Sequence, residues 1–167
     1  MATGNNVNVV LQSSQASLLA GNVATTGFTN AVRIQKYPDV IIKNPFRPTR
    51  AGNRNLTNPG ITPITVIAPF GSVTPMALQA LCNGNNLGTI TITELISDGK
   101  TAQTQRVLVL TNVYLIEWAM QGDRDGGLCS FTMTFDSLKQ TRASIGQNQK
   151  AAGTTSASTN VSTSKTS

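Results

Sequence analysis

The chain has 167 residues, 12% of them charged, a formal net charge of +6 and no histidine. A chain of this length is expected to form one domain, with a core large enough to fold without a metal or a disulfide framework. The missing histidine removes the commonest general base, the commonest metal ligand and every Ser-His or Cys-His nucleophile. We therefore expect no enzymatic activity and no catalytic, metal-binding or cofactor-binding residues.

The start of the chain, Met1 to Val10, lacks the basic region followed by an apolar run that defines a signal peptide. No later stretch reaches the roughly 18 apolar residues that a membrane span requires. The sequence therefore predicts synthesis in the cytosol and no membrane insertion.

Windows in which apolar and polar residues alternate with a period of two predict strands along most of the chain. They lie at residues 7–11, 32–34, 40–42, 90–94, 107–109, 113–118 and 131–135. Strands at this spacing predict an all-β fold, arranged as a two-sheet barrel or sandwich.

Between Asn44 and Pro63 the alternation stops, and proline, glycine and asparagine dominate, which predicts a long loop at residues 44–63. A loop of this length inside a compact domain is expected to be functional or to be ordered by a partner. Six of the thirteen basic residues lie in one segment, whose only acid is Asp39: Arg33, Lys36, Lys43, Arg47, Arg50 and Arg54. The three arginines inside the loop favour contact with another chain.

One helix is predicted near residues 75–83, with Thr74 as the N-cap, Pro75 at the first helical position and Gly84 at the exit. Its apolar residues at spacings of three and four would form a stripe facing the sheets: Ala77, Leu78, Leu81 and Cys82. A single short helix flanking the sheets is the expectation.

Two polar reversals predict hairpins, one at Asp98-Gly99 and one in the glycine-rich run from Gln121 to Gly127. The second contains Asp123, Arg124 and Asp125, a pattern that resembles part of a calcium loop. The later oxygen ligands of such a loop are missing, because Leu128, Cys129 and Phe131 follow. We interpret the acids as solvated turn residues.

Residues 143–167 are dominated by Ser, Thr, Ala, Gln, Asn and Gly, and such a composition cannot bury enough surface to order itself. The sequence thus predicts a domain at 1–142 and a flexible tail at 143–167. Cys82 and Cys129 form no C-x-x-C pair, so a buried thiol is the favoured interpretation for each, with a disulfide between them left open.

The order of features from Thr74 to about Thr141 resembles the second half of the Hcp proteins of bacterial type VI secretion systems. The helix run 74–84 is similar to that family's S/T-P-x-L-x-x-A-x-x-x-G segment, and Val107 to Leu115 is similar to its T-I-x-L-x-x-V-x-L segment. Residues 90–95 resemble the intervening strand, 122–127 the family's glycine-rich loop, and 131–135 its last strand. The first half departs from the family, since its Gly-Glu-Ser opening and histidine-bearing early strands are absent.

The resemblance implies a structural subunit that forms hexameric rings, which stack into the inner tube of a contractile injection apparatus and carry or chaperone effectors. It implies sheath, baseplate and spike proteins as partners, assembly in the bacterial cytoplasm, and ejection to the extracellular space or a target cell. The residues that we expect to contact neighbouring subunits or stacked rings are Arg47, Arg50, Arg54, Asp123, Arg124 and Asp125.

Two alternatives stay open at this point. The first is a phage or extracellular injection tail-tube protein, because these proteins share the same strand order. The second is a basic β-barrel that binds nucleic acid, because Tyr37 and Phe46 lie among the arginines and lysines and could stack on bases. Two aromatic residues are few for that role, so contact with a neighbouring copy is favoured.

Overall fold

The structure is a computed structural model that describes residues 7–23, 27–43, 46–48, 54–56, 60–97, 102–123, 126–145 and 151–160. Thirteen strands and one helix follow one another within these residues. They are β1 (Val7–Ser13), β2 (Val32–Ile34), β3 (Ile42–Lys43), β4 (Phe46–Pro48), β5 (Arg54–Leu56), β6 (Gly60–Ile61), β7 (Ile64–Pro69), α1 (Val73–Cys82), β8 (Ile90–Ser97), β9 (Ala102–Thr111), β10 (Tyr114–Asp123), β11 (Gly126–Thr134), β12 (Ser137–Ile145) and β13 (Ala151–Asn160). The predicted all-β class with one short helix is confirmed.

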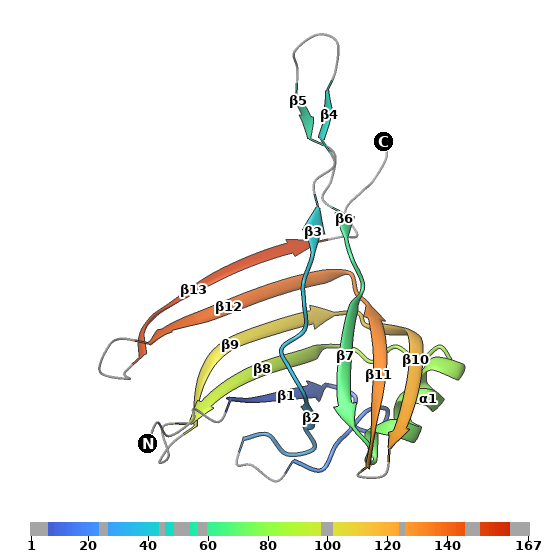
Figure 1. The fold of residues 1–167 in the computed structure, drawn as a ribbon. Helices are drawn as coiled ribbons and strands as arrows, with labels where there is room; N and C mark the ends of the chain where they lie inside the picture. Colours follow the sequence, from blue (N-terminus) through green and yellow to red (C-terminus); the bar gives the residue numbers. More distant parts are fainter. Residues whose placement is uncertain are drawn as a thin grey trace.

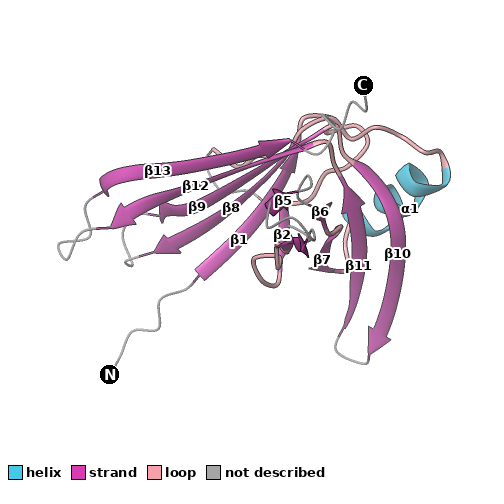
Figure 2. Ribbon diagram, turned by 90° about the horizontal axis from the view of Figure 1, so that it is seen from above, coloured by secondary structure: helices cyan, strands magenta, loops and turns pink. Residues whose placement is uncertain are grey.

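Two antiparallel sheets form the body of the molecule (Figures 1 and 2). The larger sheet has the strand order β13-β12-β9-β8-β1-β2, and the smaller sheet has the order β10-β11-β7. The described strands form an open sandwich rather than a closed barrel, with α1 lying beside β10 (Figure 2).

The core lies between the two sheets, where the alternating apolar residues meet. Ile90 and Ile92 of β8 are fully buried with Leu108 and Leu110 of β9 in the larger sheet. From the smaller sheet Phe131 and Met133 of β11 face them, next to Ile64 and Val66 of β7. Side chains two residues apart point to the same face of a strand, and the windows at 90–94 and 131–135 are confirmed as strands that face the core. In β9 the buried residues are Leu108 and Leu110, one position away from the alternating Val107 and Val109 of the predicted window.

The helix begins two residues earlier than the sequence predicted, with Ser72 rather than Thr74 as its cap residue. Pro75 is therefore the third helical residue, where its missing N–H costs no intrahelical bond. At the other end Gly84 has a φ of 61°, Asn85 N–H donates to the Ala80 carbonyl and Gly84 N–H to the Leu81 carbonyl, which closes the helix as a Schellman motif.

The buried face of the helix also differs from the predicted stripe. It consists of Val73, Ala77 and Ala80, whereas Leu78 and Cys82 are exposed. The earlier start includes Val73 in the first turn, and small residues allow the helix to approach the sheets closely. Cys82 and the buried Cys129 are both free thiols, so only Cys129 matches the prediction of a buried thiol.

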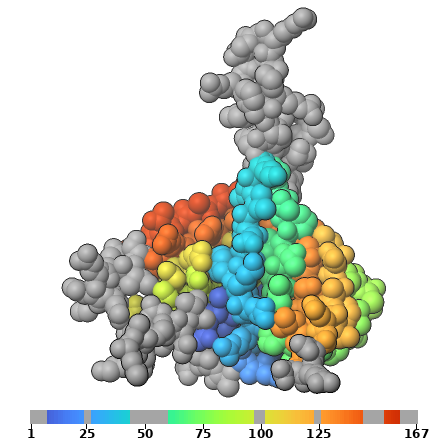
Figure 3. All heavy atoms as spheres, in the orientation of Figure 1, coloured from blue at the N-terminus to red at the C-terminus, as the bar shows by residue number. Residues whose placement is uncertain are grey.

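The predicted loop at 44–63 contains three short strands, which corrects the expectation of a segment without periodic structure. β3 pairs with β6, and β4 pairs with β5 as a hairpin that stands away from both main sheets (Figure 1). We call the described residues of 42–61 the arm. Residues 35–43 and 60–67 run side by side along the body to the base of the arm (Figure 3). These strands have only two or three residues each, too few to stand out from the proline- and asparagine-rich sequence around them.

Part of the predicted flexible tail forms regular structure. β12 continues to Ile145, and β13 pairs with β12 from Asn160 opposite Ser137 to Ala151 opposite Ile145. The side chains of residues 153–158 are exposed, so β13 is held by backbone hydrogen bonds at the sheet edge and not by apolar burial. Residues 161–167 lie outside the described residues, and the division of the chain at residue 142 stays a prediction.

The described residues form no helix that is long and apolar enough to cross a lipid bilayer.

Candidate assembly surfaces

Three of the six residues predicted to contact other subunits are described, and they lie at two opposite ends of the molecule. Arg47 lies on β4 opposite Asn55, and Arg54 lies on β5 opposite Pro48, so the two arginines belong to the same hairpin. Asp123 ends β10 at the opposite end, where it pairs with Gly126 (Figure 1). Arg50, Arg124 and Asp125 lie outside the described residues. The structure therefore brings the arm arginines together and separates them from Asp123.

The segment that leads to the arm is attached to the larger sheet by an ion pair and an aromatic ring. Arg106 of β9 donates from both Nε and Nη2 to the carboxylate of Glu94 on β8, the second bond at 3.0 Å. The Arg106 guanidinium carbon also lies 4.3 Å from the centroid of the Tyr37 ring. A charge-assisted bidentate bond and a cation–π contact thus hold Tyr37 against the sheet.

The bond to Glu94 is the main cause of the raised pKa of Arg106, which keeps this guanidinium charged. Sequence reasoning missed the cluster, although one signal was available. Glu94 occupies the inward position of a window that begins Ile90 and Ile92, and an acid at such a position needs a buried partner. The partner could not be named without the register that places Arg106 opposite Glu94.

The Tyr37 hydroxyl gives a pH-dependent prediction. Burial is the main cause that raises the pKa of Tyr37 to about 12, against a smaller lowering by Arg106. The unfolded chain loses this proton near pH 10, so the free energy of unfolding should fall between about pH 10 and 12 as the pH rises. Tyr37→Phe should flatten this part of the profile in chemical denaturation at stepped alkaline pH. Tyr114→Phe, which changes an exposed tyrosine, is the control and should keep the wild-type slope.

The same cluster bears on the nucleic-acid alternative. Tyr37 packs under Arg106 on the sheet, and its partly buried ring is not an open platform on which a base could stack. Lys36 pairs with Asp39 at 3.4 Å, and Arg33 lies on β2, away from the arm hairpin. The basic segment therefore does not form one continuous patch with interleaved aromatic faces among the described residues.

Strand β10 is an exposed apolar edge. It is the outer strand of the smaller sheet, and Ile116 and Met120 are 51% and 58% exposed, with Tyr114 also exposed. A bulge between Leu115 and Glu117 interrupts its pairing with β11. Edge strands with exposed apolar residues are prone to pair with another chain, and soluble proteins usually protect them. We interpret β10 as a surface that is covered in the assembled state.

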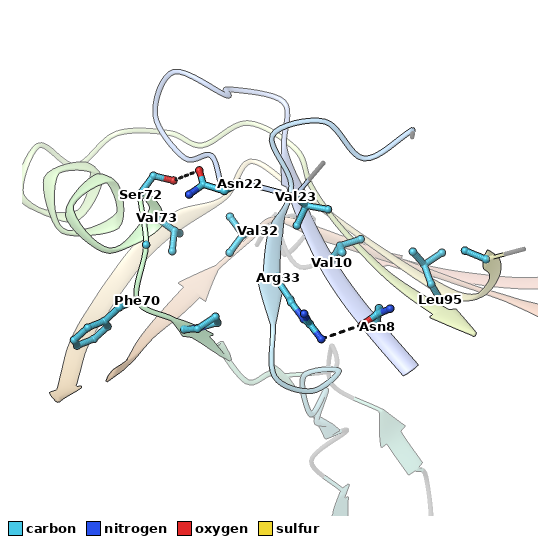
Figure 4. Close-up of a pocket in the computed structure, with 14 residues that line it drawn as sticks. Asn8, Val10, Asn22, Val23, Val32, Arg33, Phe70, Ser72, Val73 and Leu95 are labelled. Carbon is cyan, nitrogen blue, oxygen red and sulfur yellow. Dashed lines mark hydrogen bonds between the residues drawn. The ribbon is translucent and has the colours of Figure 1, made fainter. Parts of the chain in front are cut away.

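A cavity of about 400 Å³ lies between β1, β2 and the segment that joins β7 to α1 (Figure 4). Its walls are mostly apolar, and Arg33 is the only charged residue among the described residues that line it. Arg33 donates to Asn8 Oδ1 at 3.3 Å, and the Ser72 hydroxyl donates to Asn22 Oδ1 at 3.1 Å. These two hydrogen bonds hold polar side chains in place at two sides of the opening, while the walls of the cavity remain mostly apolar.

An open antiparallel sandwich with a projecting hairpin and an exposed apolar edge defines a structural protein built to associate with other chains. Residues 9–142 match the family model described as "Type VI secretion system effector, Hcp". This match spans more than half of the chain, and the chain belongs to the Hcp family. Family membership favours the type VI tube protein over a phage tail-tube protein or a nucleic-acid-binding barrel, and it carries homo-oligomeric assembly with it.

Solved Hcp structures share this fold at low sequence identity. Hcp1 from Salmonella typhimurium is 10% identical, with a TM-score of 0.74 over 93% of this chain and 95% of that one. A type VI secretion system effector from Yersinia pestis is 11% identical, with a TM-score of 0.68 over 92% and 99%. The secreted protein Hcp3 from Pseudomonas aeruginosa is 16% identical, with a TM-score of 0.61 over 92% and 96%. No curated protein sequence matches the chain significantly.

Proposed function

We propose that this chain forms rings of six copies that stack into the inner tube of a type VI secretion apparatus and carry or chaperone effectors. The observation that carries the proposal is the family match over residues 9–142 on a fold with a projecting arm. Sheath, baseplate and spike proteins are its further partners. The tube assembles in the bacterial cytoplasm and is ejected into the extracellular space or a target cell, and the subunit acts as a conduit without enzymatic activity.

Stacking of the rings is proposed to use the two ends described above. The arm carries Arg47 and Arg54 at one end, and Arg50 belongs to the same segment by sequence. The β10–β11 turn at the other end contains Asp123 and Asp125, with Arg124 between them. Head-to-tail stacking would bring the arm of one ring to the turn of the next ring, where opposite charges attract.

The test is the double variant Arg47→Glu/Arg54→Glu, imaged by negative stain and measured by light scattering at several protein concentrations. We expect the wild type to form stacked tubes and this variant to form single rings. Lys139→Glu/Arg142→Glu makes the same charge change at exposed positions of β12 and should stack like the wild type.

Two results would contradict different parts of the proposal. A wild-type chain that stays monomeric at high concentration would contradict both the proposed ring and the proposed tube. An arm variant that forms tubes as long as those of the wild type would agree with the proposed tube but would show that the arm arginines are not needed for the stacking contact.

A further inference from the structure

We infer that the cavity beside Arg33 is the docking site for strand β10 of a neighbouring copy, with Glu117 of that copy contacting Arg33. This inference rests on the proposed function, since it assigns the lateral contact within the ring. It is distinct from the stacking contact of the arm.

The backbone of β2 is open at the cavity. On its outer edge the Ala31 carbonyl accepts from Val23 N–H, and Gln35 N–H donates to the Ile67 carbonyl. Backbone groups of alternate residues point to the same side of a strand, so the N–H and C=O of Arg33 face this edge between the two bonds. Within the described residues neither Arg33 group makes a backbone hydrogen bond. The gap between Val23 and Ile67 can accept a short piece of extended chain.

The side chains around this gap define what can enter it. Val10 and Leu95 form one apolar wall, and Phe70, itself 41% exposed, stands on the opposite side of the opening (Figure 4). The exposed Arg33 supplies a positive charge, and the described residues that line the cavity include no acid to neutralise it. An extended segment that carries a carboxylate next to an apolar side chain matches all three properties.

Glu117 on β10 meets this description. The other acids whose side chains the structure describes have partners, since Asp39 pairs with Lys36, Glu94 with Arg106, and Asp136 accepts from Asn112. Glu117 is exposed, and among the described groups it accepts only a 3.4 Å bond from the Thr132 hydroxyl. The half-exposed Ile116 precedes it at the bulge.

The occupant is a second copy and not another part of the same chain. Within the smaller sheet β11 lies between β10 and β7, which keeps a chain's own Glu117 away from its own cavity. The arm is excluded on charge, because its arginines would meet the positive charge of Arg33. Two different patches on one chain make a heterologous contact, which closes into a ring when the rotation between neighbours fits.

The test is a charge swap in the full-length chain. Arg33→Glu and Glu117→Arg are each expected to raise the concentration at which half of the chains are in rings by about tenfold or more, because like charges then face each other. The double variant Arg33→Glu/Glu117→Arg restores the opposite pair and should recover most of the wild-type ring fraction. Lys139→Glu, an exposed change on β12, is the matched control and should form rings like the wild type.

Ring fraction is measured by analytical ultracentrifugation, with circular dichroism and thermal unfolding to show that each variant is folded. Recovery in the double variant supports the contact. Normal rings in both single variants, or no recovery in the double variant, overturns it while leaving the ring itself intact. Should Arg33→Glu not fold, Arg33→Met decides instead: a reduced ring fraction supports the contact, and a wild-type fraction overturns it. Wild-type chains that form no rings would contradict the proposed function itself.

Discussion

Replacing Arg106 with methionine is expected to lower the free energy of unfolding by about 2–3 kcal/mol. The Glu94 side chain is only 10% exposed, and Arg106 supplies its ionic hydrogen bonds. Removing one member of a buried ion pair leaves the other charge desolvated and uncompensated, which costs about 3–5 kcal/mol when both members are fully buried. Arg106 is 36% exposed, so water can reach part of the site and the loss should be smaller. Urea denaturation at neutral pH measures it.

The control is Lys36→Met, which breaks the pair that Lys36 forms with Asp39. The two side chains are 66% and 83% exposed, and removing such a pair should change stability by no more than about 0.5 kcal/mol. The double variant Glu94→Leu/Arg106→Met removes both charges and should recover most of the loss caused by Arg106→Met. Equal losses for Arg106→Met and Lys36→Met would show that burial of Glu94 does not matter.

Much of the sandwich could be predicted because its strands bury one face. The windows around Ile92 and Phe131 alternate apolar and polar residues, and their inward residues are buried, as are Val9 and Leu11 of β1. β7 was missed although Ile64, Val66 and Ala68 alternate in the same way and are buried. Pro63 and Pro69 flank this short run, and the proline-rich segment before it hid the start of the strand.

Strands held by backbone pairing alone could not be found in this way. β13 contains glycine, serine and threonine, and nothing in its composition shows that main-chain hydrogen bonds to β12 order it. The β4–β5 hairpin was also missed, because its three-residue strands lie among prolines, glycines and asparagines that predict a loop. Side-chain patterns report burial, and the described side chains of β13 are mostly exposed.

The candidate surfaces were predictable only where one segment carries them. The arm arginines could be found because they are close together in the sequence. The cavity is built from β1, β2 and the β7–α1 connection, which are distant in the chain, so Arg33 appeared as one more basic residue. Its surroundings depend on pairing and register, and a single sequence does not contain these.

Phe131→Ala is expected to be the most destabilising single substitution considered, at about 3–5 kcal/mol, because it removes a fully buried aromatic ring and leaves a cavity. Phe131 lies on the central strand of the smaller sheet, opposite Val66 on one side and Trp118 on the other. Neighbours paired on both sides restrict the collapse that would reduce the cavity. Thermal and urea unfolding measure the loss.

Met120→Ala in the same sheet is the matched control, since Met120 is 58% exposed and its truncation should change stability by less than about 0.5 kcal/mol. In assembly the order of the two effects should reverse, so that Met120→Ala lowers the ring fraction more than Phe131→Ala does. Phe131 lies inside one subunit, so Phe131→Ala should form rings wherever it remains folded, whereas Met120 lies on the strand that we place in the lateral contact. A Phe131→Ala loss as small as that of Met120→Ala would mean that the core does not lie between these two sheets.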